Sequence, residues 1–176
     1  MEFPGLVTIG TMFYASDAPT NDPMAEALAS SDYLKSTLEF VVAHEVAHEW
    51  WSAAVGSDSK RHPFVDEALA NHSAVLYFEK THGPEAAAAQ RDLQLKLPYQ
   101  LARLAGAEDR PVDLPTKDFG GMLEYAAVVY GKGALFFGAM REQVGDAAYF
   151  AFLKDYYRRF TFKVATNDDL ILGIAK

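Results

Sequence analysis

A chain of 176 residues that is half apolar and carries a net charge of −8 has the size and composition of one folded domain, not those of a disordered segment. Its basic residues are scattered, which argues against nucleic-acid binding, and its most apolar stretch, residues 123–140, is interrupted by charges and glycines, which argues against a membrane span. Because cysteine is absent, disulfides and thiolate metal sites are excluded, and any metal must be bound by histidines and carboxylates.

The first part of the chain predicts a strand followed by a long helix. Residues 6–14, LVTIGTMFY, are rich in β-branched and aromatic side chains, which favour a strand. Ser31 or Asp32 can cap a helix that runs to about Ala54 and stops at Gly56. Apolar residues recur along this helix at helical spacing: Leu34, Leu38, Val41, Val42, Val46 and Trp50.

Helices dominate the rest of the chain. After a loop they are expected, in order, at residues 64–82, 84–105 with a disturbance at Pro98, 132–144 and 146–160, and the segment 108–121 is expected to be irregular. Thr166 or Asn167, with Asp169 behind it, is typical of the capped start of a last, short helix. One strand among several helices is an incomplete architecture, since a lone strand has no partner for its backbone groups. We therefore expect a mainly α chain cut from a longer α+β parent.

The stretch HEVAHEWW, residues 44–51, carries the strongest chemical signal. Helical residues that are four apart lie on the same face, so the imidazoles of His44 and His48 can converge on one metal ion. Glu45 projects about 100° around the helix from His44, beside such an ion, where its carboxylate can accept a proton from water. This H-E-x-x-H pattern is typical of zinc peptidases and predicts one Zn²⁺ per chain.

A catalytic zinc ion needs a third protein ligand and one open position. Glu67, 19 positions after His48, is expected in the first turn of the next helix, after a loop that lets the two helices pack side by side. A different interpretation makes both histidines polar edges of a buried helix, and Glu67 an acid that the helix dipole favours. The flanking apolar residues oppose that alternative, because they are expected to bury the segment, where unpaired polar groups are costly; they are Val41, Val46, Ala47 and Trp50.

These residues resemble the gluzincin metallopeptidases, and specifically the aminopeptidase-N family with its leukotriene-hydrolase relatives. That family carries H-E-x-x-H, eighteen residues and then Glu, a pattern that His44, Glu45, His48 and Glu67 match. The family's third ligand usually lies in a Trp-Leu-Asn-Glu-Gly-type stretch. This chain has FVDEALA instead, with an aspartate before the glutamate and an alanine after it.

Two tyrosines extend the resemblance. The family's Tyr-x-Lys-Gly is matched by YGKG, residues 130–133, and a second family tyrosine, five residues earlier, is matched by Tyr125. The resemblance implies that Tyr130 donates a hydrogen bond to the oxyanion that forms on the substrate. Gly131 stands where the family often has glutamate. The alternative is that Tyr130 is an aromatic residue of the core.

The start of the chain resembles a further family element, Gly-x-Met-Glu-Asn, whose glutamate binds the free amine of the substrate. MEFPG, residues 1–5, shares its Met-Glu core, with Phe3 in place of the asparagine and without the preceding glycines. In having a proline at position 4, the chain resembles the leukotriene-hydrolase branch of the family. The resemblance implies that Glu2 is the amine anchor.

The resemblance runs from Glu2 to about Leu172 and implies the helical portion of a thermolysin-like zincin catalytic domain, residues 1–176, with a residual N-terminal strand. Family members carry a β-rich domain before this region, most of a catalytic sheet and a helical domain after it, so truncation at both ends is expected. The implied activity is zinc-dependent removal of N-terminal residues from peptides with a free N-terminus. A thermolysin-like endopeptidase, an epoxide hydrolase and a non-catalytic scaffold fragment are the alternatives.

Three other histidines, His62, His72 and His82, lack ligand spacing to the H-E-x-x-H stretch. They are expected to be surface residues or hydrogen-bonded residues of the core.

Overall fold

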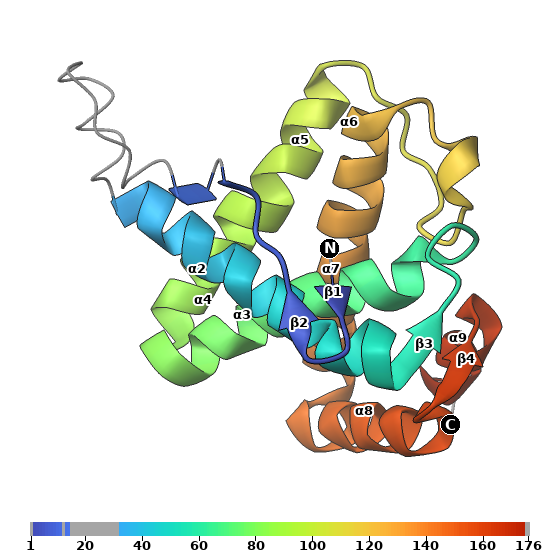
Figure 1. Ribbon diagram of the computed structural model, residues 1–176. Helices are drawn as coiled ribbons and strands as arrows, with labels where there is room; N and C mark the ends of the chain where they lie inside the picture. Colours follow the sequence, from blue (N-terminus) through green and yellow to red (C-terminus); the bar gives the residue numbers. More distant parts are fainter. Residues whose placement is uncertain (1, 12, 15–31, 175–176) are drawn as a thin grey trace, which may run out of the picture.

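Helices form most of the molecule, of which this computed structural model describes residues 2–11, 13–14 and 32–174 (Figure 1). The H-E-x-x-H stretch lies at the end of α2 (Asp32–Ala47), with His48 between this helix and the π-helical η2 (Glu49–Ala54). The next helix consists of the π-helical η3 (Phe64–Ala68) and α3 (Leu69–His82). These confirm the two helices predicted there, and α2 packs against α3 as expected. Of the two predicted caps, Asp32 begins α2, and Ser31 lies outside the described residues.

The third predicted helix is continuous and is built from α4 (Pro84–Gln90), the π-helical η4 (Arg91–Lys96) and α5 (Leu97–Leu104). A proline ring conflicts with the carbonyl group four residues earlier, which for Pro98 belongs to Gln94. That carbonyl lies inside η4, so the disturbance expected at Pro98 takes the form of a wider helical turn just before the proline.

A single long helix runs from α6 (Met122–Tyr125) through the π-helical η6 (Ala126–Gly133) to α7 (Ala134–Val144). The predicted start at residue 132 was wrong by ten residues. Gly131 and Gly133, which are unfavourable in a helix by intrinsic propensity, allow close packing of this helix against its neighbours. A Cβ atom would lie 2.9 Å from the Leu95 carbonyl oxygen at Gly131 and 2.8 Å from the Ala68 Cβ at Gly133. The helix therefore contacts its neighbours with its backbone at these two points.

The end of the chain follows the prediction closely. The irregular segment contains only the short 3₁₀ helix η5 (Thr116–Asp118), and α8 (Asp146–Phe160) follows Gly145, whose φ is +79°. In front of α9 (Asn167–Ile174), the Thr166 amide donates to Asp169 Oδ2 over 3.0 Å and the Asp169 amide donates to Thr166 Oγ1 over 3.3 Å. This reciprocal capping confirms the predicted helix start.

Two small sheets replace the lone strand that was expected. The strand predicted over residues 6–14 was too long, since the strand β2 comprises only Leu6–Val7. Its antiparallel partner β1 (Glu2–Phe3) also has only two residues, which limits the pairing. The pairing of β3 (Val55–Ser57) with β4 (Lys163–Ala165) was not predicted. Gly56 lies in β3 and does not end the helix; a Cβ atom there would lie 3.1 Å from the Lys163 carbonyl oxygen. Glycine thus allows the close approach of β4.

The core lies where α3, α7 and α8 meet η3 (Figure 1), with Phe64, Leu69, Phe137 and Tyr156 almost fully buried. Of the residues expected to bury the zinc-motif helix, Ala47 is buried as predicted, whereas the expectation was wrong for Val46 and Trp50, whose exposed fractions are 41% and 49%. These two side chains line an open groove that also contains Ser73, Leu76 and Tyr77 of α3. Within the described residues, no helix combines the length and apolar character needed to cross a bilayer.

Candidate metal centre

The predicted ligands come from two elements that are separate in the sequence. His44 lies in the last turn of α2, His48 directly follows that helix, and Glu67 lies in η3. The Nε2 atoms of the two histidines are 3.1 Å apart. Glu67 Oε2 lies 3.4 Å from the first of these nitrogens and 3.3 Å from the second. Among the described residues, these three form the group whose donor atoms converge as metal ligands do.

The triangle of donor atoms has the right size for zinc. Zinc binds imidazole nitrogen and carboxylate oxygen at about 2.0–2.1 Å in a tetrahedral arrangement, which places neighbouring donor atoms about 3.3–3.4 Å apart. The three observed separations of 3.1, 3.3 and 3.4 Å agree with that geometry. Three protein ligands leave the fourth tetrahedral position open, as in catalytic rather than structural zinc sites.

The electrostatics of the triad also suit a cation. The side chains of His44, His48 and Glu67 have exposed fractions of only 11%, 2% and 19%. Burial on its own would raise the pKa of Glu67, but the nearby imidazoles of His44 and His48 outweigh it and hold this pKa well below its ordinary value. The carboxylate is therefore ionised at neutral pH, which is the state that a metal ligand requires.

Tyr130 lies beside the triad, in η6. Its ring centroid is 5.8 Å from that of His44 and 5.7 Å from that of Tyr125, which meets it edge-on. Burial, the charge of Glu67 and a hydrogen bond to Glu67 all raise the pKa of Tyr130 far above its ordinary value. Burial likewise raises the pKa of Tyr125 to about 12. Both hydroxyl groups keep their protons at neutral pH, so Tyr130 can act as a hydrogen-bond donor.

The other two predicted residues are placed less fully. Glu45 is half-buried in the last turn of α2, directly after His44. The backbone of Glu2 lies in β1, and its side chain is outside the described residues. The hairpin of β1 and β2 is held next to the ligand helix, because the Gly5 amide donates to both carboxylate oxygens of Glu49, at 2.9 and 3.1 Å (Figure 1).

Two polar residues near the triad were not identified from the sequence as parts of the site. Asp66, with 2% of its surface exposed, accepts hydrogen bonds from the backbone amide of Glu67 and from two serine hydroxyls. Asn71 is also buried, and its side-chain amide donates to the carbonyl oxygen of Tyr130. Its spacing from Glu67, four residues along the same helix, was the signal that could have suggested a role beside the ligand.

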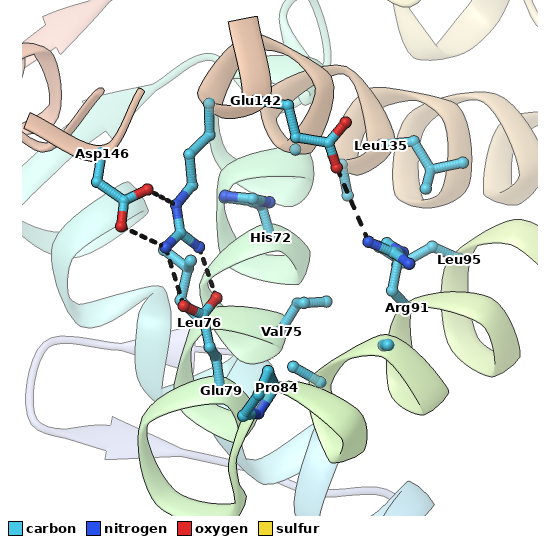
Figure 2. A pocket seen from close by; sticks show the side chains of 15 residues that line it. His72, Val75, Leu76, Glu79, Pro84, Arg91, Leu95, Leu135, Glu142 and Asp146 are labelled. Carbon is cyan, nitrogen blue, oxygen red and sulfur yellow. Dashed lines mark hydrogen bonds and ion pairs between the residues drawn. The ribbon is translucent and has the colours of Figure 1, made fainter. Parts of the chain in front are cut away.

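The other histidines stay apart from the triad, as predicted. His72 is a residue of the core, but the expectation that its ring is hydrogen-bonded was wrong for Nε2, which has no partner among the described residues. His82 Nε2 lies 2.6 Å from Glu39 at the surface. His72 is buried at the edge of a cavity of about 320 Å³ between α3, α4 and α7, whose lining contains no residue of the triad (Figure 2). On one side of this cavity, Arg141 binds the carboxylates of Glu79 and Asp146.

The chain is similar to known proteins along nearly its whole length. The sequence profile described as "Peptidase family M1 domain" matches residues 1–176. The human "Endoplasmic reticulum aminopeptidase 2" is 26% identical over 172 residues, which are 97% of this chain and 17% of that protein. The rice (Oryza sativa subsp. japonica) "Aminopeptidase M1-A" is 26% identical over 170 residues, which are 97% of this chain and 18% of that protein.

A solved structure gives the same result at the level of the fold. A mutant of the M1 zinc metallopeptidase from Deinococcus radiodurans superposes with a TM-score of 0.58 at 25% identity, covering 83% of this chain and 30% of that one. In sequence, the chain spans less than a fifth of the length of the two curated relatives described above. The helical core described above corresponds to a part of that metallopeptidase.

Proposed function

The chain belongs to peptidase family M1, and on this premise we propose that it acts as a zinc-dependent aminopeptidase. The observation that carries the proposal is the buried triangle of His44 Nε2, His48 Nε2 and Glu67 Oε2, whose edges of 3.1, 3.4 and 3.3 Å suit one zinc ion. The names of the curated relatives, both aminopeptidases, support the reaction class. We propose residues 1–176 as a segment of one gluzincin, thermolysin-like catalytic domain.

Each remaining residue of the centre has a proposed role. Zinc, when bound by the triad, supplies Lewis-acid chemistry and lowers the pKa of water. Glu45 accepts the proton of the attacking water and passes it to the leaving amine as the peptide bond breaks. Tyr130, whose high pKa keeps its hydroxyl protonated, donates a hydrogen bond to the oxyanion on the former carbonyl carbon.

The preference for a free N-terminus is assigned to Glu2. A carboxylate that pairs with the substrate ammonium forms a charge-assisted hydrogen bond, which favours substrates with an unblocked amine. The attachment of the Glu2 hairpin to Glu49, directly after His48, supports a position beside the metal centre. A thermolysin-like endopeptidase is the alternative, because it would use the same triad without the amine anchor.

The proposal is tested by Glu45→Gln in the zinc-loaded chain. The amide cannot accept a proton, so hydrolysis of an aminoacyl amide should be lost while bound zinc is retained. Glu39→Gln, a glutamate six residues earlier on the same helix that bonds Tyr77 and His82, is the matched control and should leave turnover unchanged. Full activity in Glu45→Gln would exclude this role for the residue.

A second comparison separates the two kinds of peptidase. The aminopeptidase reading predicts cleavage of a free aminoacyl substrate and very little cleavage of its N-acetylated form, with about a ten- to hundredfold preference in kcat/KM. Glu2→Ala should reduce this preference without loss of zinc. Equal rates on both substrates would favour the endopeptidase.

A further inference from the structure

We propose that Asp66 is a positioning residue of the metal centre, which holds Glu67 in place for zinc through the backbone. This inference rests on the proposed function, since it assumes that Glu67 is a zinc ligand. It goes further by assigning a role to the residue that departs from the usual asparagine of the family pattern.

The Asp66 carboxylate accepts three hydrogen bonds from its surroundings in the protein. Oδ1 accepts the backbone amide of Glu67 at 2.8 Å. Oδ2 accepts the hydroxyl of Ser57 at 2.5 Å and that of Ser59 at 2.7 Å. The residue has an exposed fraction of 2%, so water does not compete for these bonds. A buried carboxylate with three donors is expensive to rearrange.

The three bonds connect Glu67 to a fixed part of the fold. Ser57 belongs to β3, which is paired with β4 from the other end of the chain through Ala165. Asp66, one residue before the proposed third ligand, therefore ties the start of η3 to the end of β3 and to the loop between them. The packing of α2 against α3 holds the two ligand-bearing helices together, whereas the hydrogen bonds of Asp66 attach the backbone of Glu67 itself to the loop before it. A ligand must be held to about 0.5 Å for a productive site.

The chemistry of the two hydroxyls explains why aspartate and asparagine can exchange at this position. A serine hydroxyl can donate or accept a hydrogen bond, whereas a backbone amide only donates. In Asp66→Asn, the carbonyl oxygen of the new side chain can still accept from the Glu67 amide, while its NH₂ group donates to the two serine oxygens. In Asp66→Ala the Glu67 amide loses its acceptor, and both hydroxyls lose theirs.

The experiment measures the affinity of the 176-residue chain for Zn²⁺ by competition with a chelator, together with the melting temperature of the zinc-free chain. Asp66→Ala should bind zinc about 10- to 100-fold more weakly, the usual cost of removing a residue that orients a metal ligand. Asp66→Asn should lose much less than tenfold. Glu79→Ala is the control for general destabilisation. It removes a carboxylate that is bound to Arg141 of α7 (Figure 2). Glu79 lies on the same helix as Glu67, about 18 Å from it at 1.5 Å per residue.

The outcomes separate this inference from the function on which it rests. A wild-type chain that binds no zinc would overturn the proposed function. A wild type that binds zinc, with Asp66→Ala equally tight or with Glu79→Ala equally weakened, would overturn the role of Asp66 alone. If Asp66→Ala does not fold, the double variant Ser57→Ala/Ser59→Ala takes its place, because it keeps the carboxylate but detaches it from β3. Zinc affinity should fall in that variant, and an unchanged affinity would overturn the proposal.

Discussion

The side-chain amide of Asn71 donates a hydrogen bond to the backbone carbonyl oxygen of Tyr130 over 3.0 Å. Asn71 lies one helical turn after Glu67, and Tyr130 lies in η6, so this bond joins the helix that carries the third ligand to the helix that carries the proposed oxyanion donor. This buried contact adds to the hydrogen bond between the side chains of Tyr130 and Glu67 in setting the distance between them.

Three π-helical segments contain or directly follow residues of the candidate site. η2 begins directly after His48, η3 contains Glu67, and η6 contains Tyr130. A π-helical turn changes which carbonyl groups are paired within the helix, and such turns are frequent at functional sites. In η6 this altered pairing coincides with the carbonyl of Tyr130 that Asn71 binds. The local helix geometry and the position of the functional residues are therefore linked.

The triad predicts one zinc ion per chain. Metal analysis of the purified chain should find it, and His48→Ala should lose most of it, because two donors cannot complete the site. His82→Ala is a suitable control, since that histidine binds Glu39 at the surface and lies outside the triad. A folded wild type without zinc, even after incubation with the metal, would contradict the prediction.

Tyr130→Phe should keep zinc and lower kcat by roughly 10²–10³, the usual cost of removing one oxyanion donor. The ring contacts with His44 and Tyr125 remain in this variant, so its melting temperature should change little. Tyr77→Phe, which removes a hydroxyl bound to Glu39, is the control and should leave kcat unchanged. A Tyr130→Phe variant that loses stability but keeps its kcat would identify the residue as part of the core only.

Gly133→Ala should destabilise the chain by about 1–3 kcal/mol, because the added methyl group overpacks a closed interface. Its Cβ atom would lie 2.8 Å from that of Ala68 and 3.2 Å from the Phe64 ring. In Gly138→Ala, on the same long helix, the nearest atom is His72 Cε1 at 3.9 Å. That substitution should gain up to about 1 kcal/mol from helix propensity. Thermal or urea unfolding of the two variants measures the contrast, and equal effects would contradict the packing argument.

The sequence predicted the parts of the molecule that are specified locally. The ligand triad follows from a four-residue spacing within α2 and from a glutamate at the start of the next helix, and the capping of α9 follows from Thr166 and Asp169. Long helices with periodic apolar residues were predicted with nearly correct ends, since burial of one face dictates their period.

Features that depend on distant contacts were missed. The helix through Gly131 and Gly133 looks broken until Leu95 and Ala68 are seen to pack against these glycines. The β3–β4 pair joins residues 55–57 to residues 163–165, and three residues in each strand are too few for an alternating pattern. Asp66 was noted as a departure from a family pattern, but its role depends on two serines that only the folded loop brings near.

His72 makes the stability of the chain depend on pH. Burial and the positive charge of Arg141, opposed by the negative charge of Glu79, together lower the pKa of His72 from 6.5 to about 3. The other titratable group at the ring is Tyr149, 5.5 Å away between centroids, which burial keeps protonated. Since the folded pKa lies below the unfolded one, the unfolded chain binds the proton first as the pH falls. The contribution of His72 is complete above about pH 6.5 and is lost progressively toward pH 3.

The variant His72→Gln has no titratable ring at this position, so it isolates the effect. Between pH 7 and pH 5 the wild type should lose about 2 kcal/mol of unfolding free energy relative to this variant, at about 1.4 kcal/mol for each pH unit below 6.5. Urea unfolding of both chains at the two pH values, in the same metal state, measures the difference, and carboxylates such as Glu67 cancel because both chains contain them. Parallel losses of stability in the two chains would show that His72 is protonated in the folded state as readily as in the unfolded one.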